Sequence, residues 1–109
     1  MIRYFSDENG FPRVEVIDGH PNIGSFLEQD IQSSSLGCQE YMSAAEDVEV
    51  GRLPEWSGTG NAHTVTIRPS GVSIENVWDE GLDVAEMSIP QFKQCLGSWL
   101  RCISQTSGS

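Results

Sequence analysis

The chain has 109 residues, of which 16 are Asp or Glu and six are Lys or Arg, giving a formal net charge of −10. This length fits one domain over residues 1–109, and a 38% hydrophobic content with three Trp residues fits a folded chain better than a disordered acidic one. The charge disfavours direct binding of nucleic acid or of an anionic membrane surface, and no apolar stretch reaches the ~20 residues of a membrane span.

The N-terminal residues and the cysteines predict a cytoplasmic protein with reduced thiols. Asp7 and Glu8 interrupt the chain before an apolar run can develop, so we expect no signal peptide. The cysteines are odd in number, which makes a poor disulfide framework. Cys95 and Cys102 are seven residues apart in a helical pattern, about 10.5 Å, which is too far for a bridge. Cys38 lies outside that helical pattern and is freer, but a buried or inert thiol is the expectation for it as well.

The first half of the chain predicts a hairpin and two helices. The segments 1–5 and 12–18 indicate two strands around an Asn9-Gly10 turn that extends towards Phe11. A helix is predicted by apolar residues at helical spacing, namely Ile23, Phe26, Leu27 and Ile31. A second helical segment is expected over about 36–45. Because negative charge is unfavourable at a helix C-terminus, we expect this helix to stop before three acids, Glu46, Asp47 and Glu49.

The second half predicts a hairpin, a short strand and a long helix. Residues 51–61 indicate a loop or irregular strand around Trp56, and 62–68 alternates with His63, Val65 and Ile67 on one face. The returning strand runs from Val72 towards Trp78, and 84–87 adds a short strand. Ser88 and Gln91 predict a capping box, and Pro90 suits the first turn of a helix. An apolar stripe then covers four turns: Ile89, Phe92, Cys95, Leu96, Trp99 and Ile103. We expect residues 104–109 to be a frayed tail.

This order of elements predicts an α+β fold. The short hairpin connections favour an antiparallel sheet of about four to five strands packed by about three helices. No internal repeat, βαβ spacing or interdomain linker is present in the sequence.

Motifs for catalysis, metals or cofactors are weak. His20 and His63 are isolated from each other and from every cysteine, and Asp79, Glu80 and Asp83 lack the pattern of an EF-hand loop. The glycine-bearing segment 57–61 has neither the lysine nor the helix of a phosphate loop. A small enzyme that uses His20 or His63 stays an alternative, but six scattered cations are few for holding a phosphate. We therefore expect no enzyme activity, no metal and no cofactor.

The acids point collectively to partner binding. From Val14 to Gly51 there are eight acidic residues and no lysine or arginine. Such a surface speeds encounter with a basic macromolecule, although acids that only confer solubility are the commoner case. The candidate surface is this acidic tract (Glu28, Asp30, Glu40, Glu46, Asp47 and Glu49) or the turn from Glu75 to Asp83. Trp56 and Trp78 lie nearby in sequence and are predicted either to anchor an interface or to pack in the core.

The segment from Trp56 to Ile103 resembles small bacterial immunity proteins of polymorphic toxin systems, of the contact-dependent growth inhibition type. The resemblance lies in Gly58-Thr59-Gly60-Asn61-Ala62-His63, in the strand Val72 to Glu80, and in Ser88-Ile89-Pro90-Gln91-Phe92 with Leu96-x-x-Trp99. The segment Phe26 to Ile31 also fits. These motifs are structural cues, and no family binding residues carry over.

The resemblance implies a cytoplasmic inhibitor of a cognate toxin C-terminal domain. Many such toxins are nucleases with a basic cleft for phosphates, which an acidic protein would occupy by charge complementarity. The residues expected to bind the partner are Glu46, Asp47, Glu49, Trp56, Trp78, Asp79, Glu80 and Asp83. The alternative is an acidic adaptor or nucleic-acid mimic that binds another basic protein.

Overall fold

The N-terminal hairpin forms as the sequence predicts. The computed structural model describes residues 2–16, 21–32, 34–78 and 84–107. β1 (Ile2–Ser6) pairs antiparallel with β2 (Pro12–Val16). In the turn, Asp7 Oδ1 accepts the backbone N–H groups of Asn9 and Phe11, and Gly10 has φ of 82°, which favours glycine. The turn therefore extends to Phe11.

Two helical segments follow the hairpin. α1 (Pro21–Phe26) continues into a π-helical turn, η1 (Leu27–Ile31), closed by the Gln32 N–H on the Leu27 carbonyl at 2.9 Å. Ser34 caps the next helix, α2 (Ser35–Glu49), because its side chain accepts the Gly37 N–H.

The expected end of α2 near residue 45 is wrong. The helix gains a further turn because Val48, 1% exposed, continues the buried face formed by Cys38, Ala44 and Ala45. Helix-terminal acids are unfavourable next to the macrodipole, but here Asp47 and Glu49 each pair with a cation. Burial and pairing together offset the electrostatic penalty on which the prediction relied.

The four remaining strands form one antiparallel sheet in sequence order. These are β3 (Trp56–Thr59), β4 (His63–Arg68), β5 (Gly71–Asn76) and β6 (Ala85–Met87). The segment predicted as loop or irregular strand thus contains a regular four-residue strand. The returning strand ends at Asn76, so Trp78 lies beyond it. The α+β class is confirmed, with the strands divided between a two-stranded and a four-stranded sheet.

The last helix, α3 (Ile89–Ser107), begins with the predicted capping box. The Gln91 N–H donates to Ser88 Oγ at 3.2 Å, and the Ser88 N–H donates to Gln91 Oε1 at 3.0 Å. The helix includes residues 104–107, which the sequence predicted to be frayed; residues 108–109 lie outside the described part.

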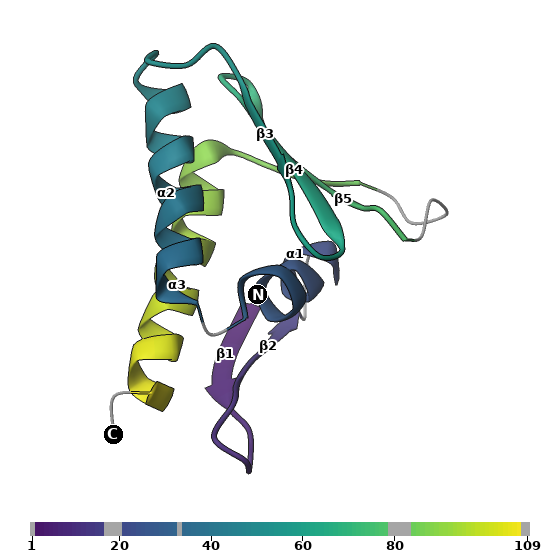
Figure 1. Ribbon diagram of the computed structural model, residues 1–109, viewed down its shortest axis with the longest axis vertical. Helices are drawn as coiled ribbons and strands as arrows, with labels where there is room; N and C mark the ends of the chain where they lie inside the picture. The colour runs from purple at the N-terminus through teal and green to yellow at the C-terminus, as the bar shows by residue number, and fades with distance from the viewer. Residues whose placement is uncertain (1, 17–20, 33, 79–83, 108–109) are drawn as a thin grey trace.

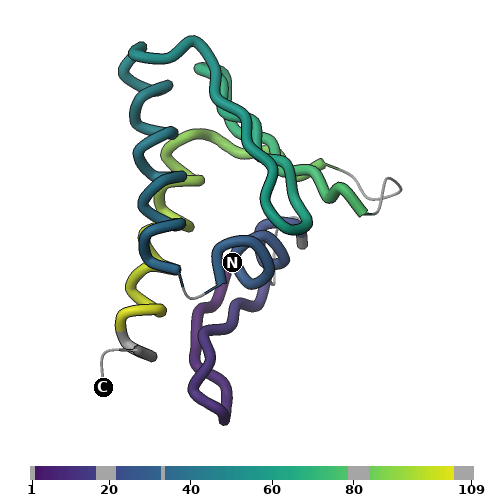
Figure 2. The backbone as a smooth tube through the Cα atoms, in the orientation of Figure 1, coloured from purple at the N-terminus to yellow at the C-terminus, as the bar shows by residue number. Residues whose placement is uncertain are grey.

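The core lies where the helices meet the two sheets. α2 and α3 pack antiparallel beside each other, and the four-stranded sheet packs against one side of this helix pair (Figure 1). α1 lies between the sheet and the hairpin. The end of α3 returns to the hairpin with which the chain begins (Figure 2). The alternation predicted for β4 is confirmed, since His63, Val65 and Ile67 are all fully buried.

Trp99 of α3 fixes the junction between these layers. It is fully buried, its Nε1–H donates to the Gln32 carbonyl at 2.9 Å, and its ring lies 6.4 Å from that of Tyr4 on β1. One side chain thus joins the hairpin, the end of η1 and the long helix.

Candidate partner-binding surface

The predicted acids at the end of α2 form a real cluster, although two of them already have cationic partners. Arg52 Nη1 donates to Asp47 Oδ1 at 3.0 Å, and Lys93 Nζ of α3 donates to Glu49 Oε1 at 2.9 Å. The hydrogen bond to Glu49 raises the pKa of Lys93. Glu46 is exposed and forms no ion pair with any described residue.

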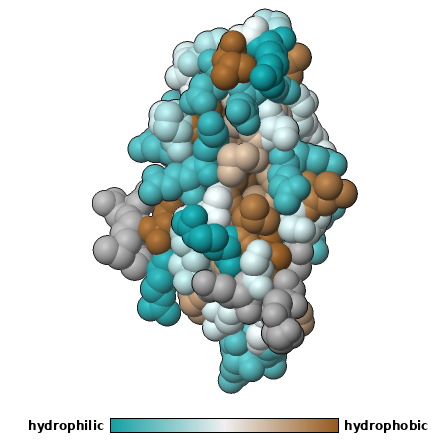
Figure 3. Space-filling view, turned by 90° about the vertical axis from the view of Figure 1, so that its left-hand side faces the viewer, coloured by the Kyte–Doolittle hydropathy of each residue, from teal (hydrophilic) through white to brown (hydrophobic). Residues whose placement is uncertain are grey.

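Beside this cluster lies a groove of about 380 Å³ between α2 and the chain entering β3. One stripe of α2 lines it at helical spacing, and Leu53 and Trp56 form the opposite wall. The stripe consists of Leu36, Gln39, Glu40, Ser43, Ala44 and Asp47. Figure 3 views the side of the molecule on which α2 lies, where hydrophobic patches are bordered by hydrophilic side chains.

Trp56 is a wall of this groove as well as a packing residue. Its ring meets that of Tyr41 on α2 edge-on, with centroids 5.5 Å apart, and the residue remains partly exposed. The ring also lies over Gly58, where an added Cβ would come within 2.6 Å of it. Gly58 is thus needed for the close approach of the indole. The packing role predicted for Trp56 is confirmed in part, and its interface role stays a prediction.

Trp78 lies elsewhere. The residue is 80% exposed, and its Nε1–H donates to the Asn61 carbonyl at 3.0 Å. Trp56 pairs with Ile67 near the end of β4, whereas Asn61 precedes His63, the first residue of that strand, so the two tryptophans lie towards opposite ends of β4. The structure therefore brings Trp56 to the acids of α2 but leaves Trp78 apart. The predicted partner residues Asp79, Glu80 and Asp83 lie outside the described residues.

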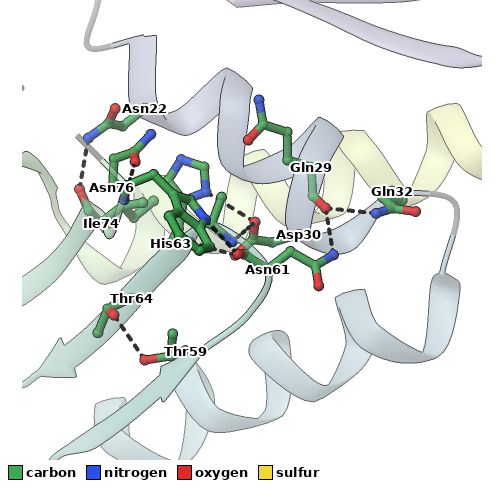
Figure 4. Close-up of polar contacts among 12 residues, drawn as sticks. Asn22, Gln29, Asp30, Gln32, Thr59, Asn61, His63, Thr64, Ile74 and Asn76 are labelled. Carbon is green, nitrogen blue, oxygen red and sulfur yellow. Dashed lines mark hydrogen bonds and ion pairs between the residues drawn. The ribbon is translucent and has the colours of Figure 1, made fainter.

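Asp30 corrects the expectation that the whole acidic tract is surface. Its side chain is fully buried, and one carboxylate accepts the backbone N–H groups of Ala62 and His63, each at 3.0 Å. Asp30 Oδ1 also lies 3.1 Å from His63 Nδ1 (Figure 4). Such a carboxylate is tolerated in the core only because its oxygens are satisfied by these donors.

This buried pair holds the β3–β4 turn against η1. Gly60 allows the approach, since a Cβ there would lie 2.5 Å from Asp30 Oδ2, and Asn61 Nδ2 donates to the Gln29 carbonyl at 3.1 Å. His63 has no exposed side-chain surface, and its Nε2 has no hydrogen-bond partner among the described residues. In this conformation a substrate has no access to the imidazole. His20 lies outside the described residues.

Sequence reasoning missed Asp30 although a signal was available. Counting from Phe26 and Leu27, position 30 falls on the same helical stripe as Ile31, so the spacing assigns Asp30 to the apolar face.

Glu28 is only partly exposed, since it pairs with Arg13 at 3.5 Å. Cys38 agrees with the expected packed and inert thiol, because it is fully buried and burial raises the pKa of its thiol to about 11.

The remaining charges leave the surface acidic. Five of the six lysines and arginines form ion pairs with carboxylates, and Arg101 instead donates to Ser98 Oγ at 3.1 Å. Several described acids have no cationic partner in the described chain: Asp7, Glu8, Glu40, Glu46, Glu75 and Glu86. Most of the positive charges are thus neutralised by carboxylates of the same chain, whereas many of the negative charges have no such partner among the described residues.

The described part of the chain contains no group of three or more His, Cys, Asp or Glu residues arranged to hold a metal ion. No helix within it is both long and apolar enough to cross a membrane. Comparisons with protein-family models, with curated proteins and with solved structures found no match.

Proposed function

We propose that this protein is a cytoplasmic immunity protein that binds and neutralises the basic nuclease domain of a cognate toxin. The observation that carries the proposal is the uncompensated negative charge: the cations are paired internally, while exposed carboxylates such as Glu40 and Glu46 are left without cationic partners among the described residues. A nuclease cleft built to hold phosphates offers the complementary potential. The sequence resemblance to immunity proteins supports the same role.

The mode of inhibition is occlusion. A rigid acidic protein that docks over the cleft replaces the phosphates of the substrate and needs no catalytic group of its own. The acids at the end of α2 suit this use because the helix is packed on α3 and tied to it by the Lys93–Glu49 pair. A preorganised charged surface loses little side-chain entropy on binding, which favours affinity.

Co-expression with the toxin domain encoded next to this protein tests the proposal. We expect restored growth and a complex that survives pull-down. Neutralising Glu46, Asp47 and Glu49 together should weaken the complex more than the matched triple change at Glu8, Glu15 and Glu86, which alters net charge equally.

A second triple variant, at Asp79, Glu80 and Asp83, tests the other predicted surface. Absence of both rescue and binding would refute the immunity role. The same protein would then be assayed as an acidic adaptor or nucleic-acid mimic of another basic protein.

A further inference from the structure

We propose that the groove between α2 and β3 is an arginine-binding site, which receives a guanidinium-bearing segment of the basic partner. This inference rests on the proposed function and specifies where on the acidic surface the partner's charge is recognised. It combines three observations: the shape and lining of the groove, the position of its carboxylates, and an arginine of the chain itself that already uses one of them.

The lining suits a side chain with an apolar stem and a cationic end. Leu36, 68% exposed, lies at one end of the α2 stripe, and Ala44, Leu53 and the partly exposed Trp56 supply further apolar surface. The methylene stem of an arginine can pack on such a surface while its planar head stacks on an indole. Leu36 therefore does not contribute to the core, and its side chain lines the groove.

The carboxylates are placed to select the charge. Glu40 and Asp47 are seven residues apart on one stripe of α2, about 10.5 Å along the helix axis, and both line the groove. Glu40 forms no ion pair with the described residues. An arginine entering between them meets an acid on either side, and Glu46 and Glu49 add negative potential near the Asp47 end.

Arg52 shows that one of these carboxylates accepts a guanidinium. It is an exposed residue held to Asp47 at 3.0 Å, with 71% of its side chain accessible. The pair is open to solvent, so its own contribution is small and exchange with another cation costs little. Arg52 thus acts as an internal competitor at the groove, and its removal should strengthen binding of a basic segment.

The test uses the full chain and a short probe whose charge can be removed without changing its size. We would titrate ¹⁵N-labelled protein with an acetylated and amidated Leu-Arg-Leu peptide, and in parallel with the Leu-citrulline-Leu peptide, which is neutral. If the groove binds the arginine peptide, the chemical shifts of the amide groups and of the Trp56 indole should change saturably and only within residues 36–47 and 53–56. The citrulline peptide should cause no such changes.

Variants then separate the groove from net charge. Arg52→Gln should tighten peptide binding about two- to five-fold, and Glu40→Gln should weaken it by a similar factor. Arg3→Gln and Glu86→Gln make the same charge changes at other exposed sites and should leave the affinity unchanged. All four side chains are on the surface, so folding is not expected to limit the comparison.

Shifts spread over the whole acidic surface, equal effects of Arg52→Gln and Arg3→Gln, or binding of the citrulline peptide would overturn the inference. None of these results touches the immunity role itself, which fails only if the toxin domain is neither bound nor neutralised. Conversely, a groove that binds the arginine peptide while the toxin domain is ignored would leave the site intact and assign it to a different basic protein.

Discussion

Replacing Asp30 by Asn should destabilise the protein severely although the side chain stays the same size. The carboxylate accepts three donors, the Ala62 and His63 N–H groups and His63 Nδ1, at 3.0–3.1 Å. An amide has one acceptor oxygen, so its NH₂ group must face at least one buried donor.

The cost follows from the burial of this network. A buried donor left without a partner costs about 1–3 kcal/mol, and loss of the charge weakens the bonds that remain. These losses compare with a total stability of about 5–15 kcal/mol for a domain of this kind. We therefore expect Asp30→Asn to lose a large part of the free energy of unfolding.

Urea unfolding followed by circular dichroism measures the effect. Asp47→Asn is the matched control, because that carboxylate is in an exposed pair and should change the stability by less than about 1 kcal/mol. A value for Asp30→Asn within 1 kcal/mol of the wild type, at an unchanged denaturant slope, would refute the reasoning. Should the variant not fold, amide exchange of the wild type serves instead: the Ala62 and His63 N–H groups must then be among the protected ones.

Three further predictions concern single sites. Gly60→Ala should destabilise by about 1–3 kcal/mol, since its Cβ would lie 2.5 Å from Asp30 Oδ2, whereas Gly97→Ala on α3 meets only an ordinary contact at 4.0 Å and should be neutral or stabilising; equal melting temperatures would contradict this. Ser88→Ala should cost about 1 kcal/mol by removing the cap of α3, and a smaller loss than that of an exposed serine such as Ser43→Ala would argue against it. Burial raises the pKa of Cys38 to about 11 from an unfolded value near 9, so the stability that this thiol contributes is complete below about pH 9 and falls as the pH approaches 11. Cys38→Ala should therefore flatten the pH dependence of urea unfolding between pH 8 and 10.5, and an unchanged slope would disprove the assignment.

The elements that were predicted well are those whose signals are local. The N-terminal hairpin and the β4–β5 hairpin each have an alternating pattern and a turn signal, and the capping box of α3 needs only Ser88 and Gln91. The end of α2 was predicted wrongly in part because one of the two cations that pair with its terminal acids is distant in sequence. Lys93, which pairs with Glu49, is 44 residues further along the chain, so no helix-end rule applied to the sequence includes it.

The residues of the candidate surface were likewise only partly predictable from the sequence. The acids of α2 and the aromatic residue Trp56 were named from composition and residue type, but the apolar lining by Leu36 on α2 and by Leu53 on the opposite wall was not. Only the packing of the chain entering β3 beside α2 leaves a groove there and turns Leu36 towards it.

The sequence by itself determined the fold class, the order of the elements and the sign of the surface charge, because hydrophobic periodicity, turn chemistry and net charge are properties of neighbouring residues or of composition. Tertiary structure alone decided which acids are surface and which are core. Asp30 and Glu40 are the same kind of residue in the same acidic tract, yet one lies beneath the β3–β4 turn and the other faces a groove. The physical reason is that the free energy of a carboxylate depends on the donors that surround it, and those donors come from parts of the chain that only folding brings together.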